Sequence, residues 1–308
     1  MNFKDCIDSY PFILMEGALG ERLKREFDLD ISGTVAMADL IYQQKGRMAL
    51  KTLWNEYMDI AHRYQLPFLA ITPTRRANKE RVYMAGYNES IITDNVDFLR
   101  TIKETVNVNM YIGGLMGCKG DAYTSERALN QEEAIAFHSW QASLFKSVGV
   151  DFLYAGIMPV LSEAIGMAVA MSDTDIPYII SFTIQRNGKL IDGHTINDAI
   201  YYINNHVSNK PVCYMTNCVH PDIVYEALSH KFNQTQMVKN RFWGIQANTS
   251  RLSYKELDGA KNLRTSSAVD LGKAILRLKS DYHLKIFGGR CGTDSRHMEE
   301  IAGISKVV

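Results

Sequence analysis

The 308-residue chain contains no apolar run of the ~18 residues that a membrane-spanning helix requires. Its 34 basic and 34 acidic residues cancel, so it lacks the basic surface on which nucleic-acid binding depends. The N-terminus has no apolar signal-peptide core, and no segment rich in proline or serine divides the chain. We therefore expect a single domain over residues 1–308, with neither a membrane nor a nucleic acid as partner.

Cysteine is scarce as well. The five cysteines are odd in number and widely spaced, at Cys6, Cys118, Cys213, Cys218 and Cys291. Such a set is typical of reduced thiols and not of a disulfide framework, so we expect a cytoplasmic location. Apolar residues make up 46% of the chain, which is enough for a large core without cross-links.

What the sequence does contain is a recurring apolar run followed by a helical pattern. The runs occupy residues 12–17, 67–73, 109–117, 152–157, 177–184, 211–218, 242–248 and 283–289. They are continuous and do not alternate, which is typical of parallel strands covered on both faces. Helical patterns fill the intervals, among them residues 131–148, 160–172, 194–207 and 266–280. Eight such units predict an α/β fold with the architecture of a (β/α)8 (TIM) barrel.

Polar residues follow several of the predicted strands. In a barrel of this kind the active site lies at the carboxyl ends of the strands. The residues of interest there are Glu16, Asn217, Cys218, Arg290 and Cys291. A thiolate is both a soft metal ligand and a nucleophile, so the two cysteines indicate zinc-assisted sulfur chemistry.

These segments together resemble the homocysteine S-methyltransferase family, which includes betaine–homocysteine methyltransferase and the homocysteine-binding barrel of methionine synthase. The resemblance covers nearly the whole chain. Its motifs are Met15-Glu16-Gly17-Ala18-Leu19-Gly20, Gly117-Cys118-Lys119-Gly120-Asp121-Ala122-Tyr123, Asn217-Cys218 with Pro221, and Gly288-Gly289-Arg290-Cys291-Gly292-Thr293. Each motif is weak alone, but their order and spacing together are specific.

The resemblance implies transfer of a methyl group to the thiol of homocysteine, giving methionine. A Zn²⁺ ion held by three thiolates would keep the acceptor sulfur deprotonated. Cys218 and Cys291 match two of those ligands and are the implied catalytic residues. Glu16 matches an acidic residue that holds the amino acid, and Asn217 belongs to the same implied substrate site. The implied partners are a thiol or amino-acid substrate and a methyl donor, with a homo-oligomer also possible.

Two positions depart from the family pattern. Arg290 stands where the third thiolate belongs, and Gly156 stands where a glutamate meets the substrate's ammonium group. A guanidinium repels Zn²⁺ and favours a carboxylate or phosphate as a bidentate partner. We therefore expect weak zinc binding and an altered substrate site, in which Arg290 either binds an anion or turns to an acidic side chain such as Glu16.

Either His220 or Cys118 would be a replacement third ligand, although His220 is also expected simply to open a helix before Pro221. Two alternatives to methyl transfer stay open. One is a zinc-independent barrel that binds a small anionic metabolite. The other is an enzyme whose nucleophile is Cys291, activated by a pKa that Arg290 lowers.

Overall fold

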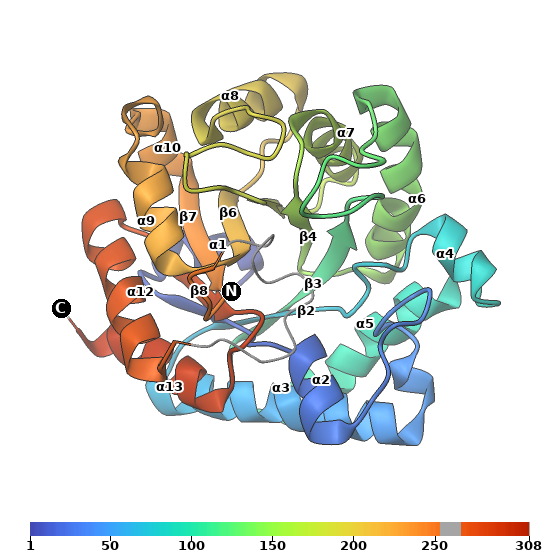
Figure 1. The fold of residues 1–308 in the computed structure, drawn as a ribbon. Coiled ribbons are helices and arrows are strands. Elements are labelled where there is room, and N and C mark those ends of the chain that lie inside the picture. The colour runs from blue at the N-terminus through green and yellow to red at the C-terminus, as the bar shows by residue number, and fades with distance from the viewer. Residues whose placement is uncertain (253–265, 308) are drawn as a thin grey trace.

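The structure is a computed structural model that describes residues 1–252 and 266–307. Eight parallel strands form a closed barrel in the order β1 to β8, and helices surround them (Figure 1). The strands are β1 Ile13–Met15, β2 Phe68–Ile71, β3 Met110–Gly117, β4 Phe152–Met158, β5 Tyr178–Phe182, β6 Cys213–Val219, β7 Phe242–Ala247 and β8 Ile286–Gly289. The predicted (β/α)8 barrel is confirmed, with every strand inside or within one residue of its expected range.

Among the described residues, one helix precedes β1 and at least one helix follows each strand. They are α1 Phe3–Ser9, α2 Gly20–Phe27, α3 Gln44–Tyr64, α4 Lys79–Met84, α5 Ser90–Lys103, α6 Gln131–Val148, α7 Leu161–Ser172, α8 Ile196–His206, α9 Pro221–Ser229, α10 Gln236–Arg241, α12 Ala268–Tyr282 and α13 Ser295–Gly303. Short 3₁₀ turns lie at Leu40–Tyr42, Lys231–Asn233 and Ile304–Lys306. In the described part of the chain, none of these helices has the length and apolar character needed to cross a membrane.

Local sequence signals explain where several helices and strands begin or end. Asn130 and Glu133 form a capping box at the start of α6, and Gly149 ends the helix with a φ of 77°. His283 ends α12 in the left-handed region, with a φ of 57°. This conformation is not extended, so β8 begins at Ile286 and not at residue 283 as the apolar run predicted.

Apolar side chains form two cores. The larger core lies between the sheet and the surrounding helices. The smaller core fills the barrel with inward-facing residues such as Ile13 and Phe152, and it also includes Phe3 and Cys6 of α1. The Phe3 ring stacks on Phe152, the first residue of β4, with centroids 4.4 Å apart. Helix α1 therefore closes the amino end of the barrel and leaves the carboxyl end for a site.

The inward side of β3 has no space for a side chain at Gly113. A Cβ there would lie 2.4 Å from the Phe152 ring and 2.9 Å from Cγ2 of Ile71. We predict that Gly113→Ala lowers the free energy of unfolding by about 1–3 kcal/mol, because an overpacked core must shift. Urea unfolding measures this loss. Gly33→Ala, whose Cβ would meet nothing within 4 Å, is the matched control, and equal stability of both variants would contradict the packing described.

Candidate functional site

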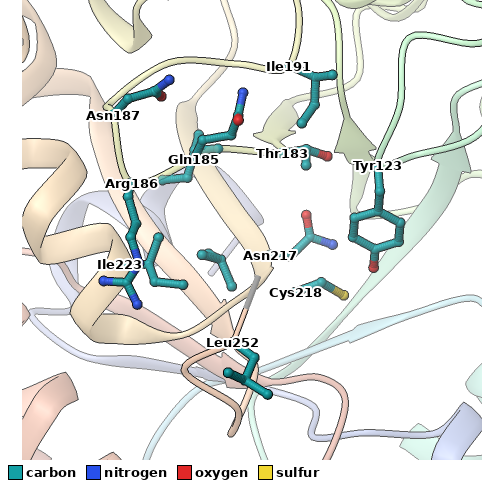
Figure 2. Close-up of a pocket in the computed structure, with 12 residues that line it drawn as sticks. Tyr123, Thr183, Gln185, Arg186, Asn187, Ile191, Asn217, Cys218, Ile223 and Leu252 are labelled. Atoms are coloured by element: carbon teal, nitrogen blue, oxygen red, sulfur yellow. The ribbon is translucent and has the colours of Figure 1, made fainter. Parts of the chain in front are cut away.

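Cys218 and Cys291 meet at the carboxyl end of the barrel. Cys218 lies in β6 and Cys291 follows β8, yet the thiol of Cys291 hydrogen-bonds to the sulfur of Cys218. Cys218 has a φ of 58°, and the β6–β7 register shifts between Asn217 and Val219. This bulge turns the Cys218 side chain towards a cavity, where Figure 2 shows it next to Tyr123.

The two thiols differ in acidity. The hydrogen bond from Cys291 lowers the pKa of Cys218 to about 6, with help from the charges of Arg290 and Arg75 and from the Tyr123 hydroxyl. The same hydrogen bond raises the pKa of Cys291, which lies exposed at the rim, although Arg290 alone would lower it. These directions favour Cys218 as the more acidic of the two thiols, in contrast to the alternative in which Arg290 lowers the pKa of Cys291.

Arg290 extends into the mouth of the barrel and does not form an ion pair with Glu16 among the described residues. Its Nε donates to Oε1 of Gln246 at 3.2 Å, and the Tyr154 hydroxyl donates to the same oxygen at 3.0 Å. Burial alone would lower the pKa of Arg290, but the negative charges of Cys218 and Glu16 outweigh it and raise that pKa. A permanent cation thus lies next to the thiol pair.

Glu16 is fully buried behind that cation. Its Oε2 accepts hydrogen bonds from Nε1 of Trp54 and from the backbone N of Ile71, each at 2.9 Å. Burial raises the pKa of Glu16 to about 7, against the opposing effects of Arg290 and of these two donors. Glu16 is therefore close to half-ionised at neutral pH.

Asn217 connects three strands below the cysteine pair. Its Oδ1 accepts from Oγ of Ser181 at 2.7 Å and from the backbone N of Ile157 at 3.2 Å. Ile157 has a φ of 62°, which is strained for a β-branched residue, so the Asn217 contact helps to hold this end of β4 in place. At the preceding residue, Gly156, a Cβ would lie 2.7 Å from Cδ1 of Leu115. No carboxylate therefore faces the mouth from the position where the family has glutamate.

One wall of the mouth is the segment between β3 and α6, which carries Tyr123. Both ends of this segment bind the buried carboxylate of Glu163, through Lys119 N at 2.7 Å and Leu129 N at 3.4 Å. Nε2 of His138 lies 3.1 Å from the same carboxylate. Glu163 thus fixes the segment that brings the Tyr123 hydroxyl to Cys218.

Neither candidate replacement ligand lies in a metal-binding group. Nδ1 of His220 accepts from Asp222 N at 3.1 Å and caps α9, as expected for a residue that opens a helix. Cys118 packs in the outer core, where burial raises its pKa to about 12. Residues 1–252 and 266–307 hold no group of three His, Cys, Asp or Glu side chains arranged for a metal ion. The donor set, two thiols next to a guanidinium, does not fit a three-thiolate zinc centre.

A cavity of about 410 Å³ opens beside Cys218 (Figure 2). Its lining includes Tyr123, Thr183, Arg186, Asn217 and Ile223, and therefore combines polar and apolar surface. This is the size and character of a site for a small metabolite.

The structure brings together Glu16, Asn217, Cys218, Arg290 and Cys291, the five site residues expected from the sequence. It adds Tyr123, Gln246 and Tyr154, to which no role was assigned. The sequence could have indicated Gln246. It lies two residues beyond Gly244 in β7 and continues the inward-facing positions at the carboxyl end of a strand. Tyr123 ends the motif that begins at Gly117, but its contact with Cys218 could not be predicted, because it reaches the site from a loop.

The ionisation of Glu16 should be visible in the stability of the protein. Its pKa of about 7 lies above the ordinary value of 4.5, so its contribution is fully present below pH 4.5 and is lost as the pH rises through 7. Glu16→Gln retains an oxygen for Trp54 and Ile71 but does not titrate. We predict that the stability of the wild type, relative to this variant, falls by roughly 3 kcal/mol between pH 4.5 and pH 8.

Urea unfolding at a series of pH values measures that difference. The exposed change Glu132→Gln is the control for loss of a carboxylate at the surface. If the free energy of unfolding changed with pH in the same way in the wild type and in Glu16→Gln, Glu16 could not be a buried carboxyl group with a pKa of about 7.

Comparison with known proteins places this site in a family. A family model described as homocysteine S-methyltransferase matches residues 13–304. The homocysteine methyltransferase MmuM from Escherichia coli has a similar fold: its metallated and oxidized forms give TM-scores of 0.76 and 0.75, each at 17% identity, covering 96% of this chain and 97% of that one. No curated protein matches the sequence. Because the family model spans the barrel from β1 to the end of α13, the chain belongs to the homocysteine S-methyltransferase family.

Proposed function

We propose that the protein transfers a methyl group to the thiol of a small amino acid, with homocysteine as the first candidate and methionine as its product. The contact between Cys218 and Cys291 at the mouth of a family barrel, beside a cavity of about 410 Å³, carries this proposal. The sulfur chemistry of the family requires polar groups that stabilise a thiolate at this place. In this chain the cation is Arg290, which lies next to both cysteines.

The chain's own residues supply the proton transfer. The Cys218 thiolate removes the proton of the acceptor thiol, which leaves Cys218 neutral and the acceptor as a thiolate. That thiolate attacks the methyl carbon of a sulfonium or quaternary-ammonium donor. The new S–C bond forms as the donor's bond to the methyl carbon breaks, and the bonding electrons stay on the donor's sulfur or nitrogen, which becomes a neutral sulfide or amine. Cys218 then returns its proton to water, so the step releases one proton overall.

Arg290 makes this exchange of charge feasible. One negative charge is present near the guanidinium before and after the proton moves, because the thiolate passes from Cys218 to the acceptor. The ion pair with Arg290 is therefore retained, which limits the free-energy cost of forming the reactive sulfur. The Tyr123 hydroxyl, which hydrogen-bonds to Cys218, is placed to stabilise the same charge.

Zinc binding tests the role of Arg290 directly. We predict that the purified wild type retains substoichiometric zinc after dialysis against a mild chelator, because two thiols are too few and Arg290 repels the ion. Arg290→Cys supplies a third thiol and removes the cation, so it should raise zinc affinity. Elemental analysis before and after dialysis measures both. Stoichiometric zinc in the dialysed wild type would contradict the expectation that two thiols next to Arg290 bind the ion weakly.

Methyl transfer tests the function itself. The wild type, offered homocysteine with S-methylmethionine, betaine or methyl-folate, should form methionine with at least one donor, without dependence on added zinc. Cys218→Ser should lose about 100-fold or more in rate, since removal of a positioned base typically costs 10²–10⁴-fold. Arg290→Cys alone should not give robust zinc-dependent transfer, because it restores the third thiol but not the second carboxylate that the resemblance implies at position 156. The double change Arg290→Cys with Gly156→Glu should come closer.

Three outcomes would contradict this proposal or a part of it. No methionine with any donor would refute methyl transfer to homocysteine. A mass increase of one methyl group on Cys218, seen with a donor and no acceptor, would show that the protein thiol is itself the nucleophile. Robust transfer by the unaltered protein that depends on zinc would instead overturn the argument that the site has diverged.

A second candidate, binding of a small anionic metabolite without methyl transfer, has one observation in its favour. The Arg290 guanidinium lies in the mouth, and its buried Nη2 has no hydrogen-bond partner among the described residues. Calorimetric binding of a carboxylate by a protein that forms no methionine would favour this candidate.

A further inference from the structure

Buried polar atoms without partners are concentrated around the carboxyl end of the barrel. Within residues 1–252 and 266–307, four such atoms belong to side chains of the site. They are Oε1 of Glu16, Nδ2 of Asn217, Nε2 of Gln246 and Nη2 of Arg290. A buried polar atom without a partner costs free energy, typically about 1–3 kcal/mol, so a cluster of them in one site indicates a missing ligand.

Three of the four side chains, those of Arg290, Gln246 and Asn217, belong to one network, and Glu16 interacts with Arg290 through its charge. Arg290 donates to Gln246, and Tyr154 donates to the same Gln246 oxygen. Ser181 hydrogen-bonds to Asn217 at 2.7 Å and also interacts with the Tyr154 hydroxyl. Residues Asn217 and Gln246 are paired neighbours across β6 and β7. The unpartnered atoms therefore line one region and are not scattered through the core.

The four atoms do not have the same hydrogen-bonding role. Three are hydrogen-bond donors, the amide nitrogens of Asn217 and Gln246 and the cationic Nη2 of Arg290. The fourth, Oε1 of Glu16, is a carboxyl oxygen that lies within the electrostatic reach of Arg290. Donors with a fixed positive charge suit an oxyanion, and the carboxyl oxygen suits an N–H group.

We infer that Arg290, Gln246 and Asn217 form a carboxylate subsite, and that this chain selects its ligand chiefly through that carboxylate and less through an ammonium group. The ligand class is a small zwitterion, with its anionic group on the three donors and an N–H on Glu16. This inference rests on the proposed function only for the presence of a thiol on the ligand. Of the three donors, Asn217 lines the cavity beside Cys218, and Arg290 is partly exposed.

Two glycines, Gly156 and Gly288, support this assignment in different ways. The mouth has no carboxylate at position 156, and we assign the N–H group of the ligand to Glu16. At position 288 a Cβ would lie 3.2 Å from Cγ of Gln246 and 2.7 Å from Cβ of Met15. The glycine thus leaves space for the Gln246 side chain to lie against β8, below Arg290.

Two truncated forms of homocysteine test the inference by calorimetry, without a methyl donor. 4-Mercaptobutyrate lacks the amino group and 3-mercaptopropylamine lacks the carboxylate. We expect 4-mercaptobutyrate to bind within about tenfold of homocysteine, and 3-mercaptopropylamine to lose about 30-fold or more, as expected for a charged hydrogen-bonding partner. Arg290→Met should abolish this preference, and Gln246→Leu should weaken it. Arg296→Met is the control, since Arg296 is an exposed arginine that pairs with Asp294 at 2.6 Å.

Equal affinity for the two truncated thiols, or an unchanged preference in a folded Arg290→Met protein, would overturn the inference. If Arg290→Met does not fold, Gln246→Leu decides the question in the same assay. Because the assay measures binding alone, a protein that shows the carboxylate preference but forms no methionine would refute the proposed function and leave this subsite standing.

Discussion

The pairing of β1 with β8 closes the sheet into a barrel, and the site exists only because of that closure. Leu14 lies opposite Phe287, and the backbone N of Gly289 donates to the carbonyl of Glu16 at 3.0 Å. This contact joins the first functional residue to the strand that carries the last two, across more than 270 positions of sequence. The parallel direction of the strands then puts all the polar termini at one end, while α1 occupies the other.

Arg290 sets the electrostatics of the mouth. Its charge acts on Glu16, Cys218 and Cys291 together, so these groups cannot be understood one at a time. In a three-thiolate centre the cation would be a metal ion that exchanges with solvent. Here the cation is a side chain, held by Gln246 and fixed in place by the fold. The chain has the barrel of its family, and a residue of the chain itself supplies a positive charge next to the cysteines.

Sequence patterns predicted the fold well, because continuous apolar runs separated by helical patterns leave few architectures open. They also placed Glu16, Asn217, Cys218, Arg290 and Cys291 together, since parallel strands end at one face. They did not assign the proton between Cys218 and Cys291, because a shared hydrogen bond depends on atomic positions. Nor did they find Tyr123, which reaches the site by way of a loop whose path depends on Glu163, 40 residues later in the chain. Contacts of this kind carry no periodic signal.

The buried carboxylate of Glu163 holds both ends of the segment from Lys119 to Leu129. Because both ends are fixed to one buried group, the segment enters and leaves the mouth at fixed points next to β3 and α6. Its interior places the Tyr123 hydroxyl against Cys218, so a substitution of Tyr123 would change the cavity wall and the acidity of that thiol together. The shape of the cavity and the chemistry of the sulfur atoms are therefore coupled through this one segment.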